Sequence, residues 1–227
     1  EKEQADDFSS AKSIRTKTLF DLAKEAGKTT AAFGWPLTMG GNITWQVDAE
    51  TVFQAGFTQM GRVLRQRPSL FGMKMRHKFG VLNHSGQPND VDDFIAAVAA
   101  DTLTEKQPQF SAIRFIELSK TREQYGVRSQ MAFDALQRID ARIGKIKRAM
   151  PQANIIVVGD GHQQNVDKLI HLNNLFLQVG WLKRTYTGQI SHNWKVVAKS
   201  AGGASYIYLR DSSLVKEVRQ LLHDLPG

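Results

Sequence analysis

The chain has 227 residues, of which 41% are hydrophobic, so it can bury a sizeable core as one large domain or as one domain with an insertion. The absence of cysteine excludes disulfides and thiolate metal sites, and no run approaches the roughly 18 apolar residues of a membrane span. The net charge of +8 raises the question of a polyanionic partner, but basic clusters such as 145–148 lack interleaved aromatic side chains. They are typical of solvated helix faces, and we do not expect specific nucleic-acid binding.

The N-terminal part predicts a helix followed closely by a strand. Thr18 and Asp21 are spaced as in a capping box, and Gly27 suits the position just past the end of a helix over 18–26. Residues 29–35 favour a strand that Pro36 ends. A helix and a strand in close succession indicate an α/β pattern.

Residues 40–108 have a less regular pattern, and we expect them to form an insertion or lid beside the main sheet. A helix is predicted within 49–66, and glycine and proline predict loop over 67–88. Asn89 can cap a further helix. Its expected buried stripe is Val91, Phe94, Ile95 and Val98.

The next segment predicts a strand over 110–117, a polar loop over 118–126 and a long helix over 130–150. On that helix Asp134 and Arg138 are spaced to form an ion pair. The apolar side of the helix is predicted to comprise Ala132, Leu136, Ile139, Ile143 and Ile146.

Residues 154–163 contain the most suggestive local pattern. The apolar run from Ile155 to Val158 predicts a strand buried on both faces, central in the sheet. Asp160 then follows at its carboxyl end, where open α/β sheets place ligands, and His162 is two positions further on. A carboxylate and an imidazole there can form a metal corner. Alternatively, Asp160 is a turn former or the N-cap of a following helix.

The C-terminal part predicts a short helix over 168–179, two strands over 194–198 and 205–209, and a terminal helix with apolar positions between 214 and 225. Helices and strands therefore alternate along most of the chain. This pattern predicts a single α/β domain over 1–227 with a mainly parallel sheet between helices.

Several segments from Thr18 to Leu209, in consistent order, carry a family resemblance. They are 18–27, 34–36, 132–146, 157–160, 166–182, 201–204 and 206–209. Together they resemble the type I phosphodiesterases and nucleotide pyrophosphatases of the alkaline phosphatase superfamily. The resemblance implies a three-layer fold and a phosphoester hydrolase that uses two ions, usually zinc, and a Thr or Ser nucleophile.

The ligand motifs of that family match this chain only in part. Asp160 matches the aspartate of Asp-His-Gly, whereas Gly161 stands at the position of the adjacent histidine and His162 comes one place late. In the earlier Asp-x-x-x-His motif, aligned through Glu117, Ser119 replaces the aspartate and Glu123 replaces the histidine.

A final histidine ligand is expected near the late strands, where His192 and Lys199 lie. The resemblance thus implies Asp160, His162 and His192 as the metal candidates, and a phosphoester or nucleotide-like small molecule as the partner. No local motif selects His192 over Lys199.

The strand and helix that carry the first metal ligand and the nucleophile in the family have no counterpart before Thr18. Two explanations are open: the chain is a fragment, or this part was lost in evolution. Two functions follow, a metal-dependent phosphodiesterase completed by other residues, or an inactive pseudoenzyme or binding module on an incomplete scaffold.

For these residues alone we expect weak zinc binding or none, and no phosphodiester hydrolysis. The family implies a periplasmic or secreted protein, although the polar N-terminus has no signal-peptide pattern.

Overall fold

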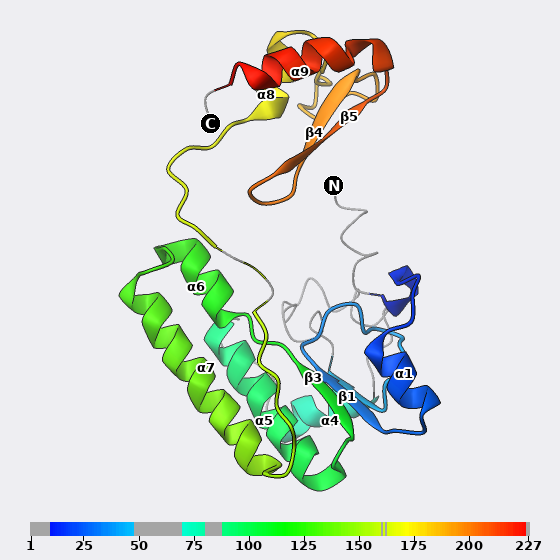
Figure 1. Cartoon of the computed structure of the whole chain (residues 1–227), viewed down its shortest axis with the longest axis vertical. Helices are drawn as coiled ribbons and strands as arrows, with labels where there is room; N and C mark the ends of the chain where they lie inside the picture. The colour runs from blue at the N-terminus through cyan, green and yellow to red at the C-terminus, as the bar shows by residue number, and fades with distance from the viewer. Residues whose placement is uncertain (1–9, 48–69, 80–87, 160, 162, 226–227) are drawn as a thin grey trace. The chain divides into compact units, whose positions relative to one another are not determined.

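The computed structural model describes residues 10–47, 70–79, 88–159, 161 and 163–225 (Figure 1). The chain divides into two compact units, Glu1–Asn165 and Val166–Gly227, and each is described by itself. Among the described helices, none has the length and apolar character needed to cross a membrane. The prediction of a single domain over 1–227 stays a prediction.

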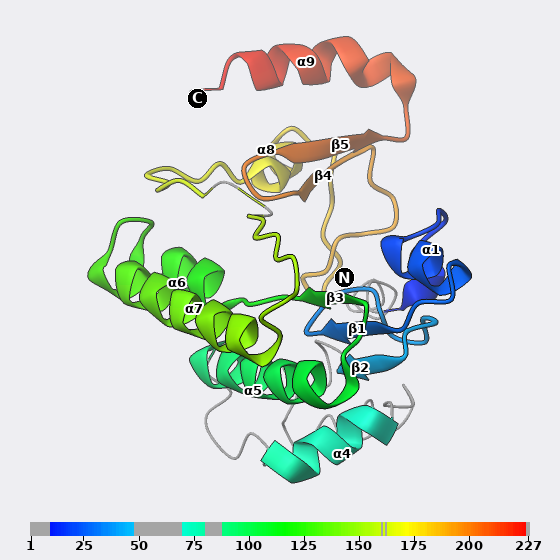
Figure 2. The same cartoon turned by 60° about the horizontal axis from the view of Figure 1, so that its bottom comes forward.

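The first unit contains a parallel sheet with helices around it (Figure 2). Its elements are the 3-10 helix η1 (Ala11–Ser13), α1 (Leu19–Glu25), β1 (Thr30–Phe33), β2 (Trp45–Val47), α4 (Leu70–Phe79), α5 (Pro88–Lys106), β3 (Phe110–Ile113), α6 (Glu117–Tyr125) and α7 (Gln130–Ala149). The strand order is β2-β1-β3, and both pairings are parallel. The predicted α/β class and parallel pairing are therefore confirmed for this sheet.

β1 is the centre of the sheet and of the core. Ala31, Ala32 and Phe33 have no exposed surface, as expected for a parallel strand that is hydrogen-bonded on both edges and covered on both faces. The strand leaves the sheet at Gly34, which has a φ of +64° and would place a Cβ 3.0 Å from the carbonyl oxygen of Arg114. Glycine is therefore required where β1 ends beside the segment after β3.

The helix α1 has the capping box predicted from Thr18 and Asp21. The Thr18 hydroxyl accepts from the Asp21 amide at 3.2 Å, and the Asp21 carboxylate accepts from the Thr18 amide at 2.8 Å. Hydrogen bonds from Thr18 lower the pKa of the Asp21 carboxyl. Phe20 is buried and packs edge to face against Phe110 of β3 at 5.1 Å between ring centroids, so α1 is fixed to the sheet.

The predicted stripe on α5 is confirmed. Val91, Phe94, Ile95 and Val98 are all buried and pack in the same hydrophobic cluster as Phe33. The helix begins at Pro88, so Asn89 lies inside it and is not the predicted N-cap. Proline suits the first turn of a helix because its missing N–H has no intrahelical partner there.

Part of the segment 40–108, predicted as an insertion or lid, belongs to the sheet and to the helices packed on it. β2 pairs with β1, and α5 packs on β1 through the hydrophobic cluster. The predicted helix within 49–66 falls in 48–69, outside the described residues. The prediction of loop over 67–88 is wrong for Leu70–Phe79, which form the helix α4. A lid formed by the remainder of this segment stays a prediction.

The region 118–126, predicted as a loop, is helical as α6. The Asp92 carboxylate on α5 accepts hydrogen bonds from the backbone amides of Ile116 and Glu117 at 2.9 to 3.1 Å. These amides at the helix start would otherwise lack partners. A polar sequence is therefore helical here because a residue distant in sequence caps it.

The long helix α7 is confirmed, but its contacts differ from those predicted. Arg138 binds Glu117 of α6, and Asp134 accepts from Gln130, so the predicted ion pair between Asp134 and Arg138 is wrong. Of the predicted apolar side, Ala132 and Ile146 are buried, whereas Leu136 is exposed. The residues of α7 that are buried are Ala132, Ala135, Arg142 and Ile146.

The prediction of a central buried strand at Ile155–Val158 is wrong. These residues form no strand, and the side chains of Ile156, Val157 and Val158 are 86%, 70% and 79% exposed. Both edges of the central strand β1 are already occupied by β2 and β3. Apolar character alone does not supply the ladder partners that a buried strand requires.

The second unit has its own small core. It contains α8 (Leu172–Gln178), β4 (Val196–Ser200), β5 (Ser205–Leu209), the 3-10 helix η3 (Ser212–Leu214) and α9 (Val215–His223). The two predicted strands are confirmed as β4 and β5. They pair with each other as an antiparallel hairpin, in a sheet separate from the parallel one, and so differ from the single mainly parallel sheet that the sequence predicts. Phe176, Leu182, Val196 and Val218 are buried together between the hairpin and its helices.

Candidate functional site

Of the three residues predicted as metal ligands, the structure describes His192 alone. Asp160 and His162 lie outside the described residues. His192 lies in the second unit, is exposed, and its backbone carbonyl accepts a hydrogen bond from Arg210 at 2.6 Å. Their assignment as ligands therefore stays a prediction.

The helix α6 carries the two positions that the resemblance aligns with the Asp-x-x-x-His motif. Ser119 and Glu123 are four residues apart and share one helix face. Glu123 is exposed and forms an ion pair with Lys120 at 2.9 Å. The helix therefore presents a hydroxyl and a lysine-paired carboxylate on this face.

The segment that follows Asp160 lies against α6. The Gln163 side-chain amide lies 3.2 Å from the backbone oxygen of Ser119 and 3.4 Å from its hydroxyl. Asn165 accepts from the Val127 amide at 3.1 Å, just beyond the end of α6. The structure thus holds residues 163–165 beside the segment 119–127, and these are the neighbourhoods of the two ligand motifs.

The described positions do not fit the second ion of a two-zinc site. A neutral hydroxyl such as that of Ser119 is a poor zinc donor, and Lys120 competes for the single carboxylate of Glu123. Within the described ranges, no group of three or more His, Asp or Glu side chains is arranged to hold a metal ion. A complete binuclear ligand set is therefore not formed by the described residues.

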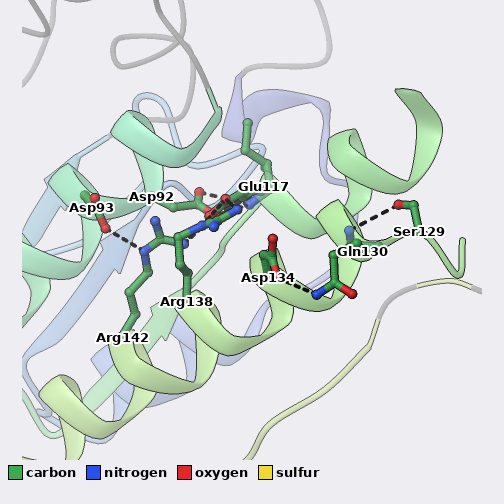
Figure 3. A network of polar contacts seen from close by, with 10 residues as sticks. Asp92, Asp93, Glu117, Ser129, Gln130, Asp134, Arg138 and Arg142 are labelled. Atoms are coloured by element: carbon green, nitrogen blue, oxygen red, sulfur yellow. Dashed lines mark hydrogen bonds and ion pairs between the residues drawn. The ribbon is translucent and has the colours of Figure 1, made fainter. Parts of the chain in front are cut away.

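A buried charge cluster fixes the start of α6 (Figure 3). Glu117, at the first position of the helix, binds Arg142 through a short ion pair and Arg138 at 2.5 Å. Arg142 also contacts Asp93 at 2.8 Å and lies 3.8 Å from Asp92. The cluster joins α5, α6 and α7 at the residue through which the family motif is aligned.

Burial and hydrogen bonding set the protonation of this cluster. Burial raises the pKa of the Asp92 carboxyl to about 6, against the lowering effect of the amides of Ile116 and Glu117 and the charge of Arg142. Burial alone would lower the pKa of Arg142, but its hydrogen bonds to Glu117 and Asp93 outweigh this effect and raise it. Arg142 is therefore a permanent positive charge, whereas Asp92 titrates near neutral pH.

Sequence reasoning missed this cluster. In the sequence Asp92 and Asp93 are two acidic residues near the start of a helix, and Glu117 serves only as an alignment point. The available signal was Arg142, a charged residue one helical turn before Ile146 on the side predicted to be apolar. An arginine at a buried helix position requires carboxylate partners from neighbouring elements.

The first unit is an α/β structure, in which a parallel sheet is covered by helices and the strand β3 leads into α6. The family model for type I phosphodiesterase / nucleotide pyrophosphatase matches residues 2–226. The chain therefore belongs to the type I phosphodiesterase / nucleotide pyrophosphatase family, as its sequence resemblance indicated. No curated protein and no solved structure matches it.

Proposed function

We propose that the protein acts on phosphoesters of nucleotide-like small molecules with a reduced metal site, in which Asp160 and His162 bind one divalent cation beside α6. The observation that supports this proposal is the hydrogen bonding of Gln163 to Ser119. It brings the neighbourhoods of the two ligand motifs together. The family match over residues 2–226 supplies the reaction class, phosphoester hydrolysis.

The reduced ligand set follows from the chemistry of Ser119 and Glu123. Two-metal phosphoesterases hold their ions roughly 4 Å apart, and each ion needs about three protein ligands. Ser119 offers a hydroxyl at one ligand position of the second ion, and Glu123 at the other position is paired with Lys120. Asp160 is therefore the one position at which this sequence has the same ligand as the family motif. We therefore expect one weakly held ion rather than two.

Metal binding is the direct test, because no residue of this sequence is matched to the family's nucleophile. We expect calorimetric titration of the protein with zinc to show one weak event, which Asp160→Ala abolishes and His162→Ala weakens. Asp167→Ala is the control, since this exposed carboxylate is close in sequence and has no ligand match. Tight binding of two ions, or one event indifferent to Asp160→Ala, would overturn the proposal.

The contribution of His192 needs a separate variant. His192→Ala should weaken zinc binding by about tenfold or more if this imidazole is a ligand, because losing one of few donors exposes the ion to competition from water. His223→Ala is the control, since it removes another exposed histidine of the second unit. Equal zinc affinity in the two variants would remove His192 from the site.

Restoring the second ligand pair provides a gain-of-function test. The double variant Ser119→Asp with Glu123→His places an aspartate and a histidine four residues apart on α6. We expect it to add a second zinc event to the titration. The control, Ser119→Asp with Gln124→His, adds the same residue types but moves the imidazole off this face, and it should leave one event.

A further inference from the structure

The hairpin of the second unit has one covered edge and one open edge. On α8, the side-chain amide of Asn173 donates to the Ala198 carbonyl of β4 at 2.9 Å and accepts from the Ala198 amide at 2.8 Å. Asn173 thus occupies the outer edge of β4 as a further strand would. β5 pairs with β4 on one side, and within the described residues it has no strand on the other.

The hydrogen-bond pattern of the hairpin fixes which backbone groups of β5 point to this open edge. The Arg210 amide donates to the Lys195 carbonyl at 2.9 Å, and the Ala201 amide donates to the Ala204 carbonyl at 2.8 Å, so bonded pairs bracket the hairpin at both ends. Between them bonded and non-bonded pairs alternate, as in any antiparallel ladder. The residues of β5 that direct their backbone groups away from β4 are Ser205, Ile207 and Leu209.

β5 lacks the features that usually prevent an edge strand from pairing. Such strands commonly carry a charge, a proline or a bulge. β5 has the sequence Ser-Tyr-Ile-Tyr-Leu, without charge or proline, and its register with β4 is unbroken. The side chains of Tyr206 and Tyr208 are 66% and 49% exposed. An uncharged strand with outward backbone groups and exposed aromatic rings is a template for another strand.

We propose that β5 of one copy of this chain pairs antiparallel with β5 of a second copy, so that two hairpins form a four-stranded sheet around a two-fold axis. This interaction goes beyond the proposed function, because it requires neither metal nor substrate.

The sequence of β5 is complementary to itself in one antiparallel register, centred on Ile207. In this register Ser205 faces Leu209 of the second copy and Ile207 faces its own equivalent, so all outward backbone groups of both strands are paired. A shift by two residues would leave one of these residues opposite no residue of the other β5.

The same register brings the exposed rings together. Tyr206 of each copy lies opposite Tyr208 of the other in non-bonded pairs, where side chains approach most closely. Two aromatic cross-strand pairs then form on the exposed face of the sheet, and such pairs stabilise antiparallel strands.

The charges that flank β5 do not oppose this register. Arg210 would lie opposite Ala204 of the second copy, and Asp211 opposite Gly203, so no like charges meet across the axis. The contact comprises the five residues of β5 from each copy. Stable interfaces use roughly 20 to 30 residues a side, so the dimer should be weak and should depend on concentration.

Sedimentation equilibrium of the full chain at moderate salt, from about 10 μM to about 1 mM, measures this association. We expect the wild type to dimerise within this range. Tyr206→Glu with Tyr208→Glu places like charges opposite each other in both aromatic pairs and should weaken the dimer at least about tenfold. Within its own hairpin the carboxylate of Tyr206→Glu lies opposite Lys199, so the pairing of β4 with β5 is kept.

A matched control makes the same change in charge elsewhere. Tyr125→Glu with Tyr186→Glu alters two exposed tyrosines outside β5 and should dimerise as the wild type does. The proposal would be overturned by a wild type that stays monomeric throughout, by a β5 variant that associates like the wild type, or by an equal loss in the control.

Amide hydrogen exchange identifies the paired edge without any substitution. The amide of Ile207 points to the open edge, so its exchange should slow as the protein concentration rises. The amides of Tyr206 and Tyr208 point to β4 and should change less. Exchange at Ile207 that is independent of concentration, whether fast or slow, would contradict pairing with a second copy.

Discussion

Two short apolar segments of the first unit, Thr30–Phe33 and residues 155–158, have similar sequence signals and opposite structures. The first is β1, completely buried and paired with β2 and β3. The second forms no strand and is largely exposed. The comparison shows that an apolar run identifies a candidate strand, whereas ladder partners and covering helices determine whether it is buried.

The largest expected effect lies in β1. Phe33→Ala should lower the free energy of unfolding by about 3 to 5 kcal/mol, because it opens a cavity beneath α5 where the ring has no exposed surface. Urea denaturation measures the change. Ile156→Ala is the matched control and should change the stability by less than about 0.5 kcal/mol. Similar losses in both variants would show that the two segments are buried alike.

The charge cluster provides the next effect. Arg142→Met should cost about 3 kcal/mol, because it leaves Asp92 and Glu117 buried without their main positive partner. Arg138→Met removes a guanidinium that is 47% exposed, and we expect a cost of about 1 kcal/mol or less. Both values come from denaturation at neutral pH. An equal cost for the two variants would contradict the dominant role assigned to Arg142.

The capping box of α1 should have a smaller effect. Thr18→Ala removes the hydroxyl that accepts from the Asp21 amide and should cost about 1 kcal/mol. Thr16→Ala, which changes an exposed threonine outside the box, should be neutral in the same thermal melt. A neutral Thr18→Ala would mean that packing of Phe20 alone holds α1 on the sheet.

The smallest effect is expected from a charge placed in the exposed run. Ile156→Asp should change the free energy of unfolding by no more than about 0.5 kcal/mol, since the side chain is mostly in solvent. A buried central strand at this position, as the sequence predicts, would instead lose about 3 kcal/mol or more. Chemical denaturation of this variant therefore distinguishes the sequence expectation from the structure.

Local signals made much of the fold predictable. The capping box of Thr18 and Asp21, the buried stripe on α5 and the two strands β4 and β5 all depend on residues close in sequence, and all three are confirmed. The family was likewise recognisable from the order of its motifs.

Long-range contacts account for what was missed. α6 depends on Asp92, which lies 25 residues before Glu117, and the ion pairs of Arg138 and Arg142 depend on how α5, α6 and α7 pack. Arg142 on the predicted apolar side of α7 signals a buried charge, but no local sequence pattern identifies its partners or those of Asp92. Of the candidate site, the sequence nominated Asp160, His162 and His192, and only the approach of Gln163 to Ser119 adds support from the structure.

The central proposal is that this chain binds one divalent cation, whereas its family resemblance implies two. X-ray absorption at the zinc edge, on the protein loaded with zinc, tests this claim most directly. We predict a single ion with nitrogen and oxygen neighbours, including imidazole from His162, and no metal–metal scattering. A zinc–zinc vector at about 3.5 to 4 Å would show a binuclear centre and contradict the claim.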